Sequence, residues 1–445
     1  MKKMPDLYDA TDLDYNADSR VIESKIEIFF DPTPITVDKD DFLIDWDVLE
    51  EVGTDSNNNP IGDTSANDFS FSLFNEEGIF SPANTAGPYY GKIKSGVKVI
   101  PYLRTKNTNW IQMGVFYVNE WNATITSLQA EISCYDDLNR IFNSDAAKPD
   151  IRANITFAQA FAYLGATLGI SPLIDSSLVE NIPWWYALNT NKDTIQKMAA
   201  GTVAACFCNR MGIVTVTNML TTKEVRAIIT DQDQLITAET QQSLTKEFDG
   251  AIVTLNKHQL TAQQEVLNIK DLVLPVGLFN SNKTQFNISP IVRLECVQFI
   301  SENTEVQFQH FIATPYDVIY RTNNNTGSTQ TANLTFLGRG LEIAKTEFYK
   351  NGLNPIINDN VYVQTDSIAT HQKEMLTRLV NSNLAYLDIE IRGNPLLQLG
   401  DKITVNSERY AINFTGYILR QQFTYTGALR AHMRLIAANI LEVGV

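Results

Sequence analysis

Few residues of this sequence have the types and spacing that catalysis requires. The adjacent carboxylates Asp136 and Asp137 could form an acid–base pair, but neighbouring residues rarely face one another, so we expect a helix start or a turn there. His371 lies near Glu374 without a further ligand at metal spacing, which favours a solvated histidine on a helix. The four histidines are far apart in sequence: His258, His310, His371 and His432.

The cysteines and tryptophans likewise favour packing over chemistry. Cys206 and Cys208 are separated by one residue, whereas redox and zinc motifs have two. Trp184-Trp185 could form a platform for a sugar ring, although paired aromatic residues packed under a loop are the expected role. We expect buried thiols in a reducing compartment for all four cysteines: Cys134, Cys206, Cys208 and Cys296.

The familiar catalytic motifs are also missing from the sequence. It contains no glycine-rich phosphate loop, no His-Glu-x-x-His and no Gly-x-Ser-x-Gly. Carboxylates are abundant, so composition alone leaves a glycosidase pair open, but no stretch singles one out. We therefore predict no catalytic, cofactor-binding or metal-binding residues, and no cofactor.

Length and composition indicate a soluble protein of three or four domains. The 445 residues are 44% hydrophobic and 19% charged, and the net charge is −16. Residues 1–63 contain 17 Asp and Glu against 5 Lys and Arg, which predicts a solvated acidic arm. This acidity argues against a stable complex with nucleic acid. The sequence has no run of eighteen apolar residues and no signal peptide, so we expect no integral membrane segment.

The elements that would position any site are mostly strands. Residues 68–74 alternate apolar and polar side chains, which predicts a strand with one buried face. The segment from Trp110 to Trp121 is apolar on both faces, which predicts a central strand. Residues 20–142 are thus expected to form one antiparallel β-domain, closed or nearly so. Its other strands are predicted at residues 25–30, 41–46, 97–103 and 128–135, with a surface loop at 55–60.

The hydrophobic period changes to that of helices after residue 150. Thr156 and Gln159 form a capping-box pattern before a helix that ends near Gly169. A second helix is predicted from Asp193 to Asn209, and a third covers about residues 367–383. Further strands are predicted at residues 213–217, 251–256, 292–299, 305–313 and 333–337, with an exposed loop at 322–331.

The C-terminal part returns to alternating strands. They are predicted at residues 386–392, 410–414, 417–425 and 429–435. We expect Gly400 and Asp401 in a tight turn, where glycine supplies a positive φ and the aspartate bonds the turn amides. His432 alternates with Arg430 and Arg434 on the expected solvent face of the last strand.

Short motifs follow one another in a fixed order in two parts of the sequence. The first set is Leu73-Phe74-Asn75, Gly78-x-Phe80-Ser81-Pro82-x-Asn84, Tyr89-Tyr90-Gly91, Gly96-x-Lys98-Val99 and Gly114-Val115-Phe116-Tyr117-Val118-x-x-Trp121. The second set is Gly393-Asn394-Pro395-Leu396-Leu397-x-Leu399-Gly400-Asp401-x-Ile403-x-Val405. Together they resemble the hub proteins of tailed-phage baseplates and tail tips: the first set is similar to the family's first domain, and the second set to its second β-barrel. The family includes prophage and tailocin hubs and the N-terminal part of tail-associated lysins.

The resemblance implies a mainly β fold with a small α/β domain, in which two antiparallel β-barrel-like hub domains accompany inserted helical and β domains. It covers both ends of the chain and, less specifically, the middle; residues 260–340 match no motif and are interpreted as an insertion. We expect an acidic N-terminal arm (1–19), the first hub β-barrel (20–145), a small α/β domain (146–240), a β-rich domain or insertion (241–365), and a helix with the strands of the second hub β-barrel (366–445).

The same resemblance implies a structural role in a virion. Three copies would form a ring at the tail tip that joins the sixfold tail tube to a threefold tip and surrounds the DNA exit channel. The implied partners are distal tail or tube proteins above, tip, spike or fibre proteins below, and the tape-measure protein, with DNA passing without stable binding. Assembly is expected in the bacterial cytoplasm.

Two other functions stay open at this point. One is a cell-wall hydrolase, which would need a convergent pair of carboxylates. Because many hub relatives carry a lytic domain after the second barrel and the sequence stops about ten residues after its last predicted strand, we expect no enzymatic activity. The other is a host-receptor or carbohydrate-binding tail protein, for which Trp184-Trp185 and the Asn-rich loop at 322–331 are the only indications.

Overall fold

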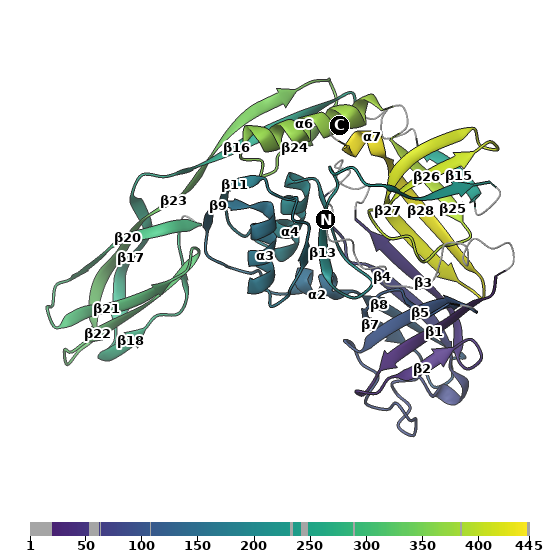
Figure 1. The fold of residues 1–445 in the computed structure, drawn as a ribbon. Coiled ribbons are helices and arrows are strands. Elements are labelled where there is room, and N and C mark those ends of the chain that lie inside the picture. Colours follow the sequence, from purple (N-terminus) through teal and green to yellow (C-terminus); the bar gives the residue numbers. More distant parts are fainter. Residues whose placement is uncertain are drawn as a thin grey trace.

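A computed structural model describes residues 20–442, apart from 53–61, 63, 107, 232–234, 242–247, 288–289 and 383–384. The predicted arm at residues 1–19 and the predicted loop at 55–60 lie outside the described residues. The protein is mainly β, as predicted. Figure 1 shows a body of two fused sheets, a small α/β domain beside it, and an elongated arm that projects away from both.

The N- and C-terminal strands of the body form one continuous 14-stranded sheet. Its strands are β1 (Ile22–Phe29), β2 (Ile35–Asp38), β3 (Leu43–Glu51), β4 (Asp68–Phe74), β5 (Lys98–Thr105), β6 (Ile111–Gln112), β7 (Phe116–Asn122), β8 (Gln129–Tyr135), β14 (Val225–Thr230), β15 (Leu235–Gln241), β25 (Tyr386–Ile391), β26 (Lys402–Ser407), β27 (Ile412–Tyr425) and β28 (Leu429–Ala437). The main path runs β15-β25-β28-β27-β3-β4-β8-β7-β5-β1-β2, and β14, β26 and β6 pair off this path. The two halves are therefore fused edge to edge.

The fusion lies between β27 and β3. These strands pair antiparallel, from Arg420 opposite Glu51 to Tyr425 opposite Trp46. The indole of Trp46 stacks on the ring of Tyr425, with 5.7 Å between the ring centroids, and both side chains are buried. The core thus continues across the boundary between the N-terminal and C-terminal halves.

The N-terminal half follows its alternating pattern except at one place. On β4, Phe69, Phe71 and Leu73 are buried on one face, as predicted. The single strand predicted from Trp110 to Trp121 is wrong, because the chain breaks into β6 and β7 around Gly114. That glycine has φ +155°, and a Cβ there would lie 2.2 Å from the ring of Phe116. The later part of β7 also has exposed residues, so the strand is not apolar on both faces.

The C-terminal half recruits two strands from much earlier in the chain. β14 pairs in parallel with β26, and β15 pairs antiparallel with β25. The expected domain boundary at residue 240 is therefore wrong, since residues 225–241 belong to the C-terminal sheet and not to the small α/β domain. The strands predicted at 410–414 and 417–425 form one strand, β27.

The small α/β domain contains α2 (Asp137–Asn143), β9 (Arg152–Thr156), α3 (Phe157–Thr167), β10 (Leu173–Ile174), β11 (Asn181–Trp185), α4 (Asn191–Gly201), β12 (Ala204–Cys208) and β13 (Val214–Asn218). The predicted capping box is present at α3: the Gln159 amide donates to the Thr156 hydroxyl at 3.2 Å, and the Thr156 amide donates to the Gln159 side chain at 2.9 Å.

The helix predicted from Asp193 to Asn209 is wrong in its second half. α4 ends at Gly201, Val203 turns the chain with a positive φ of 52°, and β12 follows. All five residues of β12 are buried. A short strand buried on both faces has the same continuous apolar sequence as a buried helix, so periodicity cannot distinguish them.

The arm and its connection to the body consist of β16 (Gly250–Leu260), β17 (Gln264–Leu274), β18 (Gly277–Asn280), β19 (Thr284–Gln285), β20 (Ile291–Ser301), β21 (Val306–Ala313), β22 (Asp317–Asn324), β23 (Gln330–Lys350), β24 (Pro355–Asn358) and α6 (Asp366–Asn381). The 21-residue β23 belongs to both parts: its first half pairs with β17 and β20 in the arm, and its second half pairs with β16. In the arm, β22 pairs with β18 and β19 on one side and with β21 on the other.

Hydrogen bonds of buried side chains hold the arm's loop and the connecting helix α6 in place. The predicted exposed loop at 322–331 is a tight connection in which Asn324 and Thr326 are buried, and the Asn324 side chain donates to the Leu274 carbonyl at 3.0 Å. α6 packs on β16, and its buried Gln372 donates to the carbonyls of Ala200 and Gly201 at 2.7 and 3.0 Å. These bonds satisfy carbonyl groups at the end of α4.

Candidate functional site

A buried ion pair lies where the two halves of the body meet the small α/β domain. Arg210 belongs to the turn after β12 and Glu50 belongs to β3, and their side chains are 4% and 6% exposed. The contact is bidentate, with Arg210 Nε 2.9 Å from Glu50 Oε1 and Arg210 Nη2 3.0 Å from Glu50 Oε2. The planar guanidinium matches the carboxylate in this geometry.

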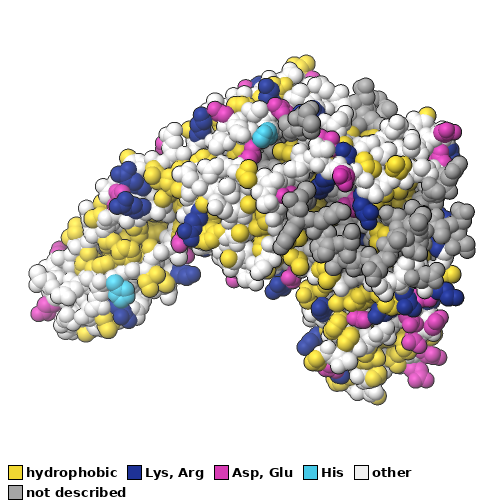
Figure 2. Space-filling model, in the orientation of Figure 1, with side chains coloured by type: hydrophobic (Ala, Val, Ile, Leu, Met, Phe, Trp, Pro, Cys, Tyr) yellow, Lys and Arg dark blue, Asp and Glu magenta, His cyan; other side chains and the backbone are white. Residues whose placement is uncertain are grey.

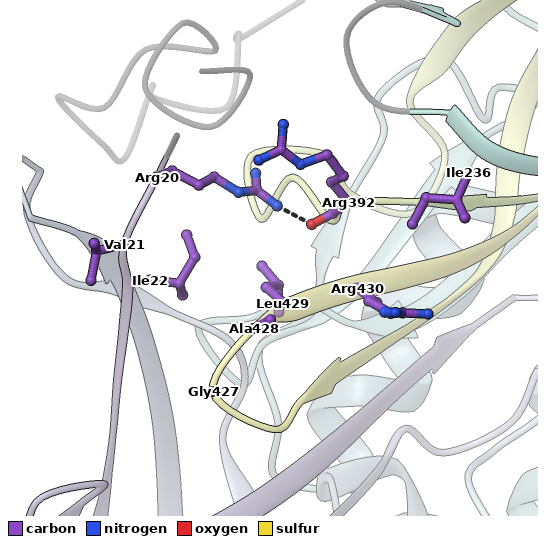
Figure 3. A pocket seen from close by; sticks show the side chains of 9 residues that line it. All are labelled: Arg20, Val21, Ile22, Ile236, Arg392, Gly427, Ala428, Leu429 and Arg430. Carbon is purple, nitrogen blue, oxygen red and sulfur yellow. Dashed lines mark hydrogen bonds between the residues drawn. The ribbon is translucent and has the colours of Figure 1, made fainter. Parts of the chain in front are cut away.

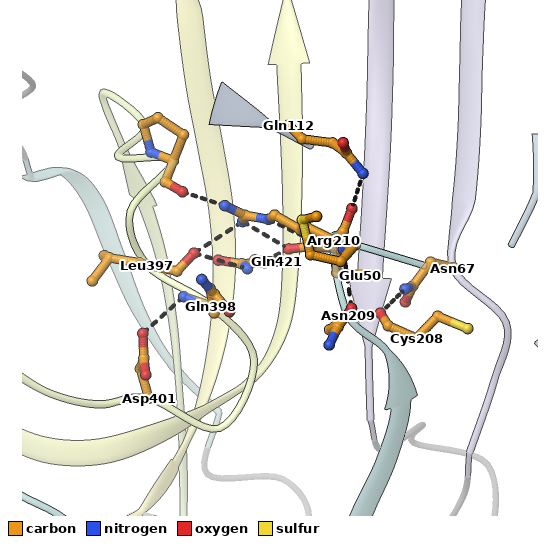
Figure 4. Close-up of polar contacts among 12 residues, drawn as sticks. Glu50, Asn67, Gln112, Cys208, Asn209, Arg210, Leu397, Gln398, Asp401 and Gln421 are labelled. Atoms are coloured by element: carbon orange, nitrogen blue, oxygen red, sulfur yellow. Dashed lines mark hydrogen bonds and ion pairs between the residues drawn. The ribbon is translucent and has the colours of Figure 1, made fainter. Parts of the chain in front are cut away.

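The C-terminal half completes this cluster (Figure 4). The Arg210 guanidinium donates to the carbonyls of Pro395 and Leu397, the second at 2.9 Å. Gln421 of β27 donates to the Glu50 carboxylate and, at 3.2 Å, to the same Leu397 carbonyl. We call Arg210, Glu50, Gln421 and the carbonyls of Pro395 and Leu397 the junction cluster. It links three parts of the chain through one buried guanidinium.

The predicted turn at Gly400 and Asp401 lies close to the junction cluster. Gly400 has φ +76°, as expected for a residue that supplies the left-handed conformation. The Asp401 carboxylate accepts a hydrogen bond of 2.9 Å from the Gln398 amide, which confirms the expected role of the aspartate. Burial raises the pKa of Asp401. Lys223 donates to the Gly400 carbonyl at 2.9 Å and so ties the turn to the segment before β14.

The outward face of the N-terminal half carries carboxylates and hydroxyls in transverse rows. In one row Asp47 is opposite Ser70, which is opposite Ser133, which in turn is opposite Glu120. The neighbouring row contains Asp45, Ser72, Glu131 and Asn122 in the same way. These side chains surround a hollow of about 350 Å³ whose lining includes no Lys or Arg. We call these two rows the acidic face.

The outward face of the C-terminal half is different in charge. On β28, Arg430 and His432 are exposed and Arg434 is half-buried, close to the prediction for this strand. The two arginines pair with carboxylates of β25: Arg430 with Glu390 at 3.1 Å, and Arg434 with Asp388 at 2.8 Å. Their positive charge is therefore largely neutralised within the sheet.

The N-terminal half, by contrast, carries acidic side chains. Figure 2 shows acidic side chains gathered over the N-terminal strands at the lower right.

A second hollow, of about 370 Å³, lies between the start of β1 and the turn after β27. Arg20, Arg392 and Arg430 contribute to its wall, together with apolar residues such as Ile22 and Leu429 (Figure 3). The Arg20 guanidinium donates to the Arg392 carbonyl. The hollow thus lies where the start of β1 meets two C-terminal turns, one after β25 and one after β27.

Asp136, considered above as part of an acid–base pair, and Trp185, considered as part of a platform for a sugar ring, have structural roles. Asp136 caps α2, since its carboxylate accepts hydrogen bonds from the amides of Leu138 and Asn67 at 2.9 and 3.0 Å. Burial raises the pKa of Asp136 to about 7. Trp185 is fully buried and its indole N–H donates to the sulfur of Met198 at 3.2 Å, as expected for a packing role.

The cysteines and His371 partly depart from expectation. Cys134, Cys206 and Cys208 are buried, and burial raises the pKa of the Cys206 thiol to about 12. Cys296 is exposed instead, because it points outward from an edge strand of the arm. His371 is not simply solvated: its Nδ1 lies 2.5 Å from Glu180 Oε1, and this hydrogen bond raises the pKa of the imidazole.

Neither a metal site nor a membrane span is found in the part of the chain that the structure describes. No three His, Cys, Asp or Glu side chains among the described residues converge in a way that could hold a metal ion. None of the described helices is long and apolar enough to cross a membrane.

Comparison with known proteins gives similarity in structure only. No protein-family profile and no curated protein matches this sequence. The 43 kDa tail protein of prophage MuSo2 from Shewanella oneidensis is 10% identical, with 96% of this chain and 100% of that chain covered and a TM-score of 0.55. The chain has the fold of a prophage tail protein. A tail protein from Neisseria meningitidis MC58 is 8% identical over 95% of this chain and 98% of that chain, with a TM-score of 0.53.

Within this tail-protein fold, sequence reasoning missed the junction cluster. Arg210 and Glu50 are 160 residues apart, and each follows an ordinary strand pattern. The only local signal was an arginine in the polar turn after β12. The resemblance quoted for Gly393 to Val405 did mark the segment whose carbonyls complete the cluster, without indicating what binds them.

Proposed function

We propose that this protein is a structural hub at the distal end of a phage or phage-like tail, in which three copies form a ring. The observation that carries the proposal is the fused body. One chain places its N-terminal and C-terminal halves side by side through β3 and β27. Three such chains would present six β-regions around a ring, which suits the junction between a sixfold tube and a threefold tip.

A ring of this kind requires a head-to-tail interface between neighbouring copies. The rotation that relates one copy to the next must complete a full turn after three copies, so that the ring closes. The junction cluster supports this role, because it fixes the angle between the two halves that every copy must present to its neighbours. We propose distal tail or tube proteins as partners above the ring, and tip, spike or fibre proteins and the tape-measure protein as the remaining partners. The fold similarity to prophage tail proteins supports a place in the virion.

The channel of such a ring must let DNA pass without holding it. We propose that the acidic face lines this channel. Each phosphate neutralised by Lys or Arg adds salt-sensitive affinity, and the hollow on the acidic face has neither residue in its lining. On the C-terminal half, Arg430 and Arg434 are already paired with Glu390 and Asp388. This role needs no catalytic residue, and we propose that the protein is not an enzyme.

Light scattering and electron microscopy of the purified protein, alone and with its tail neighbours, test the ring. We expect threefold rings and a trimeric mass. A stable monomer in the presence of those neighbours would contradict the proposal. Gel shifts with duplex DNA near physiological salt should show no complex at micromolar protein, and cell-wall zymograms should show no clearing.

A further inference from the structure

The hollow at the start of β1 has a basic lining in a protein whose net charge is −16. Three of the nine described residues that line it are arginines, Arg20, Arg392 and Arg430, and none is Asp or Glu. Arg430 also pairs with Glu390, which lies outside the lining, at 3.1 Å. A guanidinium matches a carboxylate in both charge and geometry. The lining therefore suits a ligand that carries carboxylates.

The remainder of the lining is mostly apolar. Figure 3 shows Arg20 and Arg392 on one side of the hollow, and Ile22 and Leu429 on the other. Val21, which also belongs to the lining, is 62% exposed. The volume of about 370 Å³ lies within the range of ligand pockets, about 300–1,000 Å³. A ligand with carboxylates on one side and apolar groups on the other would thus match both walls.

The sequence directly before the hollow has this composition. Residues 1–19, which lie outside the described residues, contain five Asp and two Lys. Within them, Asp12-Leu13-Asp14-Tyr15 alternates carboxylates with large apolar side chains. Alternate side chains of an extended segment point to opposite sides. Asp12 and Asp14 would therefore face one wall of the hollow while Leu13 and Tyr15 face the other.

We propose that residues 12–15 occupy the hollow of their own chain, with the two carboxylates on Arg20 and Arg392 and the two apolar side chains on the opposite wall. Chain connectivity favours this occupant, because Tyr15 is five residues before Arg20 and their Cα atoms are at most about 18 Å apart. So short a tether gives an effective concentration of about millimolar, at which weak contacts suffice. The docked segment fastens the start of β1 to the turn after β25, and so clamps the two halves of the body away from the junction cluster. This contact lies within one chain and does not depend on the ring.

Native-state proteolysis of the full-length protein tests the contact. Chymotrypsin cleavage after Tyr15, followed by mass spectrometry, reports how often the segment leaves the hollow. Arg392→Gln should raise this cleavage rate about tenfold, and so should Asp12→Asn combined with Asp14→Asn. The rate of each protein is divided by that of a synthetic peptide with the matching sequence around Tyr15, which corrects for the intrinsic susceptibility of the bond. Joining all three substitutions should give no further increase, because they remove the same contact.

The matched control is Arg321→Gln, because Arg321 lies on the arm strand β22, and this variant should be cleaved at the wild-type rate. Wild-type rates of cleavage within the body show that the Arg392→Gln variant is folded. If it is not, the aspartate variants still decide, since their substitutions lie outside the folded body. An unchanged rate in the aspartate variants, or in a folded Arg392→Gln variant, would overturn the proposal. Protection that is lost on dilution would place the segment of a neighbouring copy in the hollow and overturn the assignment to the same chain.

Discussion

The body and the arm are both built from strands, but they bury side chains very differently. The body, the small α/β domain and α6 share one large hydrophobic cluster. The arm has its own small clusters, one around Phe336 and a smaller one around Leu274. The difference indicates that the body and α/β domain are one rigid unit, whereas the arm is a semi-independent module whose stability rests on few residues.

The contacts between the arm and the rest are correspondingly few and polar. The Tyr316 hydroxyl donates to the Ala187 carbonyl at 2.9 Å, and Lys148 lies 3.9 Å from Asp317. Beyond these, the long strands β16 and β23 make the connection. We therefore expect changes in the body to affect the whole protein, and changes in the arm to remain local.

The largest effect is expected from Glu50→Ala. The Arg210 guanidinium would stay buried without its counter-charge, which should cost about 3–5 kcal/mol of unfolding free energy. Urea unfolding followed by tryptophan fluorescence measures this. The control is the double variant Glu50→Leu with Arg210→Met, which removes both charges and should be less destabilised than the single variant. Equal losses would show that the ion pair does not organise the junction.

Phe336→Ala tests the independence of the arm. Phe336 is fully buried and contacts the rings of Phe308, Phe311 and Tyr320. Its truncation should cost about 3 kcal/mol. Hydrogen exchange should show lost protection in residues 264–340 and unchanged protection in the body. If protection fell equally in both regions, the arm and the body would be one cooperative unit.

Gly400→Val should have an intermediate effect. A β-branched residue at φ +76° strains the backbone, and we expect a loss of about 1–3 kcal/mol. Gly327→Val is the matched control, because no atom lies within 4 Å of a Cβ at that position. Thermal melting compares the two variants, and a Gly400→Val variant that melts like the control would contradict the turn geometry.

The smallest effect concerns the contact of His371 on α6 with Glu180. The hydrogen bond to Glu180 raises the pKa of His371, so the stabilisation is fully present below the unfolded-state pKa of about 6.5 and disappears as the pH rises through the folded-state value. His371→Gln should therefore cost about 1 kcal/mol or less near pH 6 and nothing in alkaline solution. The control is His310→Gln, which removes an exposed imidazole of the arm strand β21. A cost that persists unchanged at alkaline pH would argue against the ion pair.

Local patterns predicted the parts of this fold whose partners are near in sequence or whose geometry is set by one residue. The alternation of β4, the capping box at Thr156 and the positive φ of Gly400 are of this kind. The assignment of β14 to the C-terminal sheet was missed, because its partner β26 lies far along the chain and its own residues are mostly exposed. The junction cluster was missed for the same reason, because Arg210 and Glu50 are 160 residues apart.

The pairing of β3 with β27 also determines the order in which this protein can fold. Asp47 and Thr424, which are bonded across that pairing, are 377 residues apart in the sequence. During synthesis β3 must therefore wait, with an unpaired edge, until β27 leaves the ribosome. The arm is made from a continuous segment and can fold long before that. Closure of the body is thus a late, non-local and slow step, and the interval before it is when the chain is most exposed to aggregation.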